Sequence, residues 1–489
     1  MNTMSEKDKL KILVVSSEVA PFAQVGGLAE FASALPKALE SQGHDVRVVL
    51  PRYRQIDGER YALKRISGSL DVDLGSRVKR AAAFETILPD SEVNAYFIWD
   101  ERYFHRDGVY GFDDDPQRFA FFARAVLALV EKLDWKPDVI HCNDWHTALI
   151  PMILDTARSK YQYFQDTVTV FSIHNLGYQG EAGRLILRFA GLDESLPLLA
   201  GIEQPGQFNF MARGIAHSDM VSTVSPSYGK QIVTDEWGGK LAPLLRKRGD
   251  RLMGVLRGFD STRWNPETDE HIVRRYTEQS IDDRIENKLA LLNELGLPVK
   301  EDTPLIGMVG RLVDQKGCDI AVPTVRRLMR GDGGEAFFVL LGLGLRKYHT
   351  LFGTLAVDFV DKARVFFKFD DALAHRIFAG SDMLIMPSLY EPCGTGQMIS
   401  MRYGCIPIVH SVGGLADTVT DVDQGGLGFT FDEYDVNAFW EALQRAMVVY
   451  HEGPNWRELQ KEAMKIDFSW NVAVRDHISL YRSALKAVR

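Results

Sequence analysis

The sequence predicts an α/β protein made of two parallel-sheet domains, and three observations lead to this fold class. Short apolar runs that are typical of buried strands alternate with stretches of helical periodicity along the chain. The alternation begins again near Leu305, after a polar region that contains Gly258 and Pro266. The chain of 489 residues is also too long for one hydrophobic core. Strand–helix alternation in both halves therefore indicates two domains, predicted at residues 1–260 and 261–470.

The first half opens with a strand–helix–strand pattern. Residues 11–16 form an apolar run, and a loop over 21–27 leads into a stretch over 28–42 with apolar residues at three- and four-residue spacing. Gly43 suits the end of this helix, and a second strand follows at 46–50. Four later strands are expected at residues 95–99, 139–141, 168–172 and 220–224, and one long helix at residues 119–133.

The second half repeats this pattern. A strand over 305–309 and a Gly-bounded loop over 310–317 precede a helix over 318–329, and the charged stretch 277–288 is expected to be an earlier helix. Further strands are expected at residues 336–341, 364–369, 383–386 and 406–410. Two facing domains of this kind leave a cleft between them, which is the default place for a ligand.

Composition excludes several classes of protein. The net charge of −9 argues against a general nucleic-acid binder, although local Arg and Lys residues can still bind phosphate. The four cysteines show no CxxC spacing, which favours reduced thiols in a cytosol over disulfides or a zinc site. The N-terminal residues are polar, and no apolar run approaches the ~20 residues of a membrane span. We therefore expect a cytoplasmic protein.

The segment 381–394 is the most informative part of the chain. Its apolar residues 383–386 are typical of a buried strand, and Glu391-Pro392-Cys393-Gly394 begins a new element at the carboxyl end of that strand. Ligands of open α/β sheets bind at this end. A carboxylate followed by backbone N–H groups suits a ligand with sugar hydroxyls and phosphates. The alternative is that Glu391 is simply an N-terminal helix cap.

Two loops suit a phosphate group. Arg311 and Lys316 flank the Gly-bounded loop that follows a strand, where two cations can hold a diphosphate and stabilise a departing nucleotide. Solvated surface cations are the alternative. Gln24 begins a turn with Gly26 and Gly27 that enters a helix, so that its backbone N–H groups can approach an anion. A plain tight turn is the alternative, and the absence of GxGxxG spacing gives no support to a dinucleotide site.

Polar groups also follow two strands of the first half. His141-Cys-Asn-Asp144-Trp-His146 offers imidazoles, a carboxylate and an aromatic plane, a combination suited to sugar binding. His141 and His146 could suggest a metal, but their spacing matches no standard helical pair. His174 ends another strand, and a lone histidine there is more often structural than catalytic. Three polar strand ends together favour a ligand site, and the chain has no GxSxG, Walker A or HExxH motif.

These residues form a set of motifs that together are highly specific. They are Ser17-Glu18 with Gly26-Gly27-Leu28, His141 with Asp144-Trp145-His146, Ile173-His174-Asn175-Leu176, Val224-Ser225-Pro226, Gly310-Arg311-Leu312 with Gln315-Lys316-Gly317, Ala374-His375-Arg376-Ile377, Glu391-Pro392-Cys393-Gly394, and Gly413-Gly-Leu-Ala-Asp-Thr418. Over residues 11–481 the chain resembles bacterial glycogen synthases and plant starch synthases. Those enzymes are retaining glucosyltransferases of the GT-B fold, in which two Rossmann-like domains face each other across a deep cleft.

The resemblance implies a role for each donor-side residue. Arg311 and Lys316 would hold the donor diphosphate, and Glu391 would bind glucosyl hydroxyls. The backbone around Cys393 and Gly394 would close on the sugar. No metal is expected, because the two cations replace it.

The resemblance also implies roles elsewhere in the chain. His174 would contact the transferring glucose near its 6-hydroxyl, and Asp144 would lie on the acceptor side. Phe369 would stand where the family usually has a Tyr that stacks on adenine. Residues 471–489 would form a helix that returns to the N-terminal domain.

The chain departs from the family pattern around the donor phosphates. Gln24 replaces the usual Lys, and Gly396 occupies the place of a Thr, for which Thr395 is the candidate substitute. Arg257 replaces an Asn, and Glu30 replaces an Asp. Leu389 replaces an Arg, and Leu345 replaces an acidic residue.

We therefore expect a glucosyltransferase that extends an α-1,4-glucan from ADP-glucose. Two alternatives stay open: a related transferase with another donor or acceptor, and a weakly active glucan-binding regulatory paralogue. Intact Arg311, Lys316, His174 and Glu391 argue against the second alternative, whereas Gln24 and Gly396 argue for it.

Overall fold

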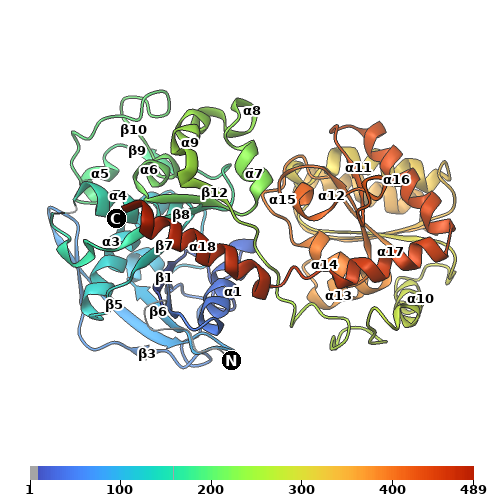
Figure 1. Ribbon diagram of the computed structural model, residues 1–489, viewed down its shortest axis with the longest axis horizontal. Helices are drawn as coiled ribbons and strands as arrows, with labels where there is room; N and C mark the ends of the chain where they lie inside the picture. The colour runs from blue at the N-terminus through green and yellow to red at the C-terminus, as the bar shows by residue number, and fades with distance from the viewer. Residues whose placement is uncertain (1–8, 158, 489) are drawn as a thin grey trace. The chain divides into compact units, whose positions relative to one another are not determined.

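The computed structural model describes residues 9–157 and 159–488, which form two compact units. One unit comprises Met1–Arg257 with Ala473–Arg489, and the other comprises Gly258–Val472. The sequence predicts these divisions at 260/261 and 470/471. Each unit contains its own sheet of mainly parallel strands, as Figure 1 shows, so the predicted α/β class with two parallel-sheet domains is confirmed.

The N-terminal unit is built on a ten-stranded sheet in the order β12-β11-β8-β7-β1-β2-β6-β5-β3, with β4 paired to β5. The parallel strands are β1 (Lys11–Val15), β2 (Asp45–Pro51), β6 (Asn94–Trp99), β7 (Val139–Asn143), β8 (Val168–Ile173), β11 (Met220–Thr223) and β12 (Leu252–Gly254). The antiparallel edge consists of β3 (Lys64–Arg65), β4 (Leu70–Asp73) and β5 (Val78–Ile87). A separate antiparallel pair is formed by β9 (Glu181–Gly183) and β10 (Gln207–Asn209).

The strand order reverses its direction of growth at β1, which lies between β2 and β7. At such a reversal the connections on the two sides leave in opposite directions, which opens a crevice at the carboxyl ends of the strands. The loops after β1, β7 and β8 are the ones that carry the N-terminal candidate residues.

The helices of the N-terminal unit are α1 (Gly27–Ser41), α2 (Glu101–Phe104), α3 (Asp115–Lys132), α4 (Leu149–Thr156), α5 (Ile186–Phe189), α6 (Phe210–His217), α7 (Pro226–Gln231), α8 (Asp235–Gly238), α9 (Ala242–Arg248) and most of α18 (Trp470–Val488). The predicted start of α3 at residue 119 is wrong, because an Asp and a Pro, which suit a first helical turn, begin the helix at Asp115. Helix α18, red in Figure 1, is part of the core of this unit, since Tyr481 is buried and its hydroxyl lies 2.8 Å from Nδ1 of His141.

The C-terminal unit has a six-stranded, fully parallel sheet in the order β15-β14-β13-β16-β17-β18. Its strands are β13 (Leu305–Val309), β14 (Phe337–Leu341), β15 (Ala363–Phe366), β16 (Met383–Met386), β17 (Ile406–His410) and β18 (Phe429–Phe431). Its helices are α10 (Arg284–Glu294), α11 (Cys318–Arg330), α12 (Arg346–Asp358), α13 (Asp371–Gly380), α14 (Gly396–Arg402), α15 (Gly413–Thr418), α16 (Val436–His451) and α17 (Pro454–Lys465). Counted within the unit, the order is the doubly wound 3-2-1-4-5-6, with its reversal between β13 and β16.

Two predicted elements of this unit have different bounds. The helix expected over 277–288 begins only at Arg284, after the 3-10 turn Ile281–Asp283. The strand expected over 364–369 ends at Phe366, because Asp370 turns the chain by accepting a hydrogen bond from the backbone N–H of Leu373 at 2.9 Å and capping α13. Phe369 therefore lies in a loop.

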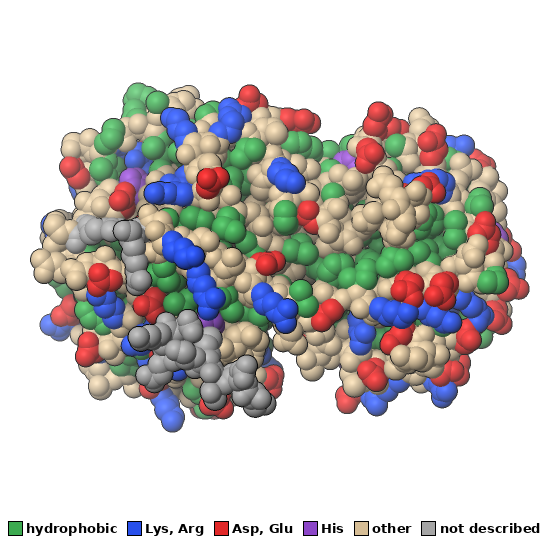
Figure 2. All heavy atoms as spheres, viewed as in Figure 1, with side chains coloured by type: hydrophobic (Ala, Val, Ile, Leu, Met, Phe, Trp, Pro, Cys, Tyr) green, Lys and Arg blue, Asp and Glu red, His purple; other side chains and the backbone are tan. Residues whose placement is uncertain are grey.

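Charged side chains of both signs are interspersed on the face of the molecule that Figure 2 shows. Among the described residues, none of the helices combines the length and the apolar character that crossing a bilayer requires.

Candidate active site

The C-terminal unit brings together three of the predicted residues at its strand-order reversal. Arg311 and Lys316 follow β13, Glu391 follows β16, and these two strands are hydrogen-bonded neighbours. A small cavity of about 20 Å³ at this point is lined by Arg311, Lys316 and Ser388, among others. The parallel topology thus juxtaposes residues that are far apart in the sequence.

Glu391 and Lys316 form an ion pair in which the carboxylate side chain is 6% exposed and the ammonium side chain 21% exposed. The hydroxyl of Ser388 donates to Oε2 of the same carboxylate at 3.1 Å. The two loops are also joined by their backbones, since the N–H of Leu389 donates to the carbonyl of Gln315 at 2.9 Å. The helix-cap alternative for Glu391 is wrong, because α14 begins only at Gly396 and its N-cap is Thr395.

A buried glutamine determines the shape of the turn after Glu391. Nε2 of Gln397 donates to the carbonyls of Cys393 and Gly394 at 3.1 and 3.2 Å, and to the hydroxyl of Thr418 at 3.0 Å. Gly394 has φ +73°, and a Cβ there would lie 2.5 Å from Oε1 of Gln397. Sequence reasoning assigned no role to Gln397, whose partners become visible only in the fold.

The two departures in this turn have distinct surroundings. Thr395 makes no side-chain capping bond, so its hydroxyl does not stabilise α14. A Cβ at Gly396 would lie 3.2 Å from Sδ of Met386, which is a tight contact. A threonine at the Gly396 position would therefore require Met386 to move.

Two donor-side residues face solvent. Arg311 is exposed, and its Nη2 donates to Oε1 of Gln315 at 3.2 Å. Phe369 is 84% exposed, although its side chain is large and apolar. Both side chains are accessible to a ligand.

In the N-terminal unit, Glu18 organises the Gly-rich loop. Its buried carboxylate accepts the backbone N–H groups of Val25 at 2.5 Å and Gly26 at 2.9 Å, and the hydroxyl of Tyr110 donates to its second oxygen at 2.6 Å. In this structure Glu18, and not a ligand, accepts the Gly26 N–H that the sequence suggested for an anion. The Ser17-Glu18 motif marked Glu18 in the sequence, but it did not indicate that this carboxylate binds the backbone of the Gly-rich loop.

Three of the departures from the family pattern lie together. Buried Arg257 donates from Nη1 to the carbonyl of Gly27 at 3.0 Å, and its Nη2 lies 3.5 Å from Oε2 of Glu30. Nε2 of Gln24, which is exposed, lies 3.5 Å from Oε1 of the same Glu30. Gln24 and Arg257 therefore share one carboxylate.

Asp144 follows β7 in a strained backbone conformation, with φ 54° and ψ 179°. Its Oδ1 accepts the backbone N–H of His174 at 2.8 Å. Burial raises the pKa of the Asp144 carboxyl to about 7, although backbone N–H groups of His174 and Asn175 oppose the rise. Strained non-glycine residues cluster at functional sites, so Asp144 is a strong candidate.

His174 follows β8 and is neutral. Its Nε2–H donates to Oδ1 of Asn143 at 2.8 Å, and its ring packs edge-on against Phe31 at 4.5 Å. Burial lowers the pKa of His174 to about 3, and the charge of Arg257 contributes further. Because Nε2 carries the proton, Nδ1 of His174 is the acceptor nitrogen. Sequence reasoning did not single out Asn143.

The two histidines of the motif after β7, His141 and His146, have structural partners. His141 is hydrogen-bonded through Nδ1 to the hydroxyl of Tyr481 at 2.8 Å and through Nε2 to the hydroxyl of Ser172 at 2.5 Å. His146 stacks on Tyr110 with ring centroids 4.6 Å apart. Both ring nitrogens of His141 are occupied, which excludes the metal alternative for this pair.

The chain matches two family models. Residues 11–247 match the model of the starch synthase catalytic domain, and residues 296–459 match that of glycosyl transferases group 1. A glycogen synthase from Moorella thermoacetica is 42% identical over 485 residues, which cover 98% of each chain. A glycogen synthase from Thermotoga maritima is 42% identical over 487 residues, which cover 98% of this chain and all of the relative's (100%).

Solved structures agree with these matches. The catalytic domain of starch synthase IV from Arabidopsis thaliana, bound to ADP and acarbose, superposes with a TM-score of 0.90 at 32% identity and covers 98% of this chain and 100% of that chain. A sucrose-phosphate synthase from Thermosynechococcus elongatus, with a TM-score of 0.61 and 16% identity over 98% of this chain and 100% of its own, shares the fold. The chain therefore belongs to the family of bacterial glycogen synthases and plant starch synthases, and it is a hexosyltransferase of the GT-B fold.

Proposed function

We propose that the protein transfers glucose from ADP-glucose to an α-1,4-glucan, with retention of configuration. The observation that carries this proposal is the set of Arg311, Lys316 and Glu391 at the reversal between β13 and β16. Its cations match a diphosphate, and its buried carboxylate matches sugar hydroxyls. The related starch synthase IV was solved with ADP and acarbose, which supports an adenine nucleotide and a glucan-like partner.

On the donor side, Arg311 and Lys316 bind the diphosphate and stabilise the charge that develops on the departing ADP. Lys316 has three N–H donors, so it can bind phosphate while still facing Glu391. Glu391 then accepts hydrogen bonds from glucosyl hydroxyls, and Phe369 offers its exposed ring to the adenine. The turn at Cys393, Gly394, Thr395 and Gly396 lies beside the sugar and phosphates.

The N-terminal residues position the sugar and the acceptor. His174 is neutral, so its Nδ1 can accept the 6-hydroxyl of the transferring glucose without placing a positive charge there. Asp144 orients an acceptor hydroxyl. Gln24 and Gly27, in the loop held by Glu18, are donor-phosphate contacts from this unit. The leaving phosphate takes the acceptor's proton, and no added metal is needed because Arg311 and Lys316 supply the charge.

A different nucleotide sugar is the second candidate. The observation that favours it is the shared carboxylate at Glu30, where Gln24 and Arg257 replace the family's Lys and Asn. A lost lysine–phosphate contact is worth ~1.5–3 kcal/mol, enough to change a donor preference.

Purified protein incubated with glycogen and a panel of ADP-, UDP- and GDP-glucose tests the donor. We expect nucleotide release that requires glycogen and is fastest with ADP-glucose. Faster release from UDP-glucose would replace the proposed donor while keeping the reaction class. Release from none of the donors would favour the non-catalytic paralogue.

A further inference from the structure

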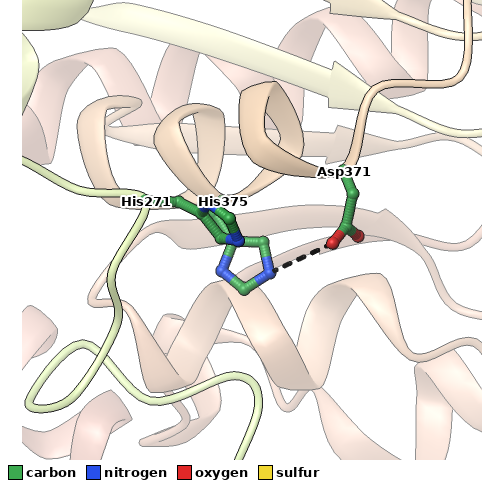
Figure 3. A group of neighbouring side chains, drawn as sticks. All are labelled: His271, Asp371 and His375. Carbon is green, nitrogen blue, oxygen red and sulfur yellow. Dashed lines mark ion pairs between the residues drawn. The ribbon is translucent and has the colours of Figure 1, made fainter.

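Three metal-ligating side chains lie together in the C-terminal unit, apart from the donor residues described above. They are His271, Asp371 and His375, and their ligating atoms all lie within 4.8 Å of one another. Asp371 and His375 stand one turn apart on α13, and His271 comes from the loop segment before α10 (Figure 3). Residues i and i+4 project from the same face of a helix, so the pair on α13 points in a common direction.

His375 is the rigid member of the group. It is 2% exposed, and its ring is stacked on Trp264 with centroids 3.9 Å apart and an interplanar angle of 12°. Its Nδ1–H donates to Oδ2 of Asp269 at 2.7 Å. Its Nε2 is buried without a hydrogen-bond partner and lies 4.0 Å from Oδ2 of Asp371. A buried nitrogen without a partner costs stability unless a ligand satisfies it.

Asp269 orients two members of the group. Its Oδ2 also accepts the hydroxyl of Tyr403 at 2.6 Å, and its Oδ1 accepts the backbone N–H of His271 at 2.8 Å. Because Nδ1 of His375 is hydrogen-bonded to Asp269, its unpartnered Nε2 is the nitrogen available to a ligand shared with the other two side chains. A carboxylate that orients an imidazole in this way is the usual partner of a metal-binding histidine.

We propose that His271, Asp371 and His375 bind one divalent transition metal ion, and that Zn²⁺ is the best match. Two imidazole nitrogens and one carboxylate oxygen suit Zn²⁺, whereas Mg²⁺ and Ca²⁺ require oxygen ligands. Arg263 pairs with Oδ1 of Asp371, which leaves Oδ2 for the metal. Water fills the fourth position.

Binding a zinc ion requires the ligand atoms to move slightly closer together. Zinc bonds of about 2.0–2.1 Å place tetrahedral ligand atoms about 3.3 Å apart, which is closer than the present 4.0 Å between Nε2 of His375 and Oδ2 of Asp371. His271 is exposed and the Asp371 side chain is 38% exposed, so both can rotate inward while His375 stays fixed. The bound metal would connect the segment around His271 to the start of α13 and stabilise this unit. It takes no part in glucosyl transfer.

Zinc titration of the chelator-treated, desalted full-length protein tests the proposal. We expect a single equivalent of Zn²⁺ to bind in competition with a chromophoric chelator and to raise Tm, and Co²⁺ to give a tetrahedral absorption spectrum. His271→Ala and Asp371→Asn should each weaken this equivalent at least tenfold and abolish the Tm rise. Both residues are partly or fully exposed, so these variants should fold.

His105→Ala is the matched control, because it removes an exposed imidazole outside the group. It should bind Zn²⁺ like the wild type. Equal Zn²⁺ binding by the wild type and His271→Ala would overturn the proposal, as would no binding at micromolar Zn²⁺. Because the readout is binding, the outcome is independent of the proposed glucosyl transfer.

Discussion

At the scale of single residues, the Lys316–Glu391 ion pair combines a chemical and a structural role. The carboxylate is buried, and the ammonium that faces it is its ion-pair partner. Arg311 is exposed and has no carboxylate partner among the described residues, although it belongs to the same candidate site. Substituting each cation in turn therefore separates a loss of catalysis from a loss of stability.

We expect Arg311→Ala and Lys316→Ala each to lower kcat by ~10²–10³, because both charges act on the departing diphosphate. Only Lys316→Ala should also lower Tm clearly, since it leaves Glu391 buried and unpaired. Steady-state kinetics and thermal unfolding check this prediction. A normal kcat with a raised KM for glucan alone would contradict the assignment of either residue.

The raised pKa of Asp144 predicts how the stability of the protein depends on pH. Its pKa of about 7 in the folded protein exceeds the ordinary value of 3.8, so the folded chain holds a proton that the unfolded chain releases. Stability from this residue is therefore fully present below pH 4 and decreases as the pH rises to 7, by at most about 4 kcal/mol. Asp144→Asn does not titrate, so its Tm should exceed that of the wild type increasingly from pH 4 to pH 8. Parallel Tm curves for the two proteins would show that Asp144 is not perturbed.

The shared carboxylate of Glu30 predicts coupling between Gln24 and Arg257. A lysine at position 24 would meet the charge of Arg257 at the same Glu30, so Gln24→Lys alone should bring little gain in kcat/KM. Adding Arg257→Asn removes the like charge, and the double variant should be more active than either single variant. A double-mutant cycle should give a coupling of about 0.5–3 kcal/mol. Strictly additive effects would exclude compensation by Arg257.

At the scale of elements, the loop after β16 depends on one backbone conformation. Gly394→Ala should lower stability by at least about 1–3 kcal/mol, because φ is positive and the new Cβ would meet Gln397. The control is Gly353→Ala in the middle of α12, where a Cβ meets only Phe367 at 3.8 Å. It should raise stability by about 0.5–1 kcal/mol. Equal denaturation midpoints for the two variants would contradict the assignment of strain to the turn.

The sequence was sufficient for the central parallel strands, but the antiparallel strands β3, β4, β5, β9 and β10 and the parallel edge strands β12 and β18 were not predicted. Buried parallel strands are continuous apolar runs, so β13 and β16 were predicted at the residues where the structure has them. The starts of α3 and α10 were missed, because capping and first-turn residues, rather than apolar spacing, determine where those helices begin. Phe369 was placed in a strand for a similar reason, since the cap of α13 at Asp370 was not recognised.

Candidate site residues on strand ends were predictable, whereas their supporting residues were not. Asn143 acts through His174, 31 residues away, and Gln397 connects its own turn to Thr418, 21 residues away; no local spacing reveals such long-range contacts. For His141 the sequence motif suggested ligand binding, but in the fold both ring nitrogens are hydrogen-bonded within the protein, to Tyr481 and Ser172.

At the scale of the whole molecule, each unit has one reversal of strand order, and the candidate residues follow the strands around it. In the N-terminal unit they follow β1, β7 and β8, and in the C-terminal unit they follow β13 and β16. In both sheets the candidate residues thus follow the carboxyl ends of parallel strands, the edge at which ligands of open α/β sheets bind.

The central claim is that this chain adds glucose to an α-1,4-glucan at the expense of ADP-glucose. Its most direct test measures ADP release and glucan length together, with a defined maltooligosaccharide as acceptor and EDTA present. We predict one ADP for each added glucose, a ladder of longer α-1,4-linked products, and no dependence on added divalent metal. ADP release without longer glucan, or elongation that appears only when magnesium is restored, would contradict the account.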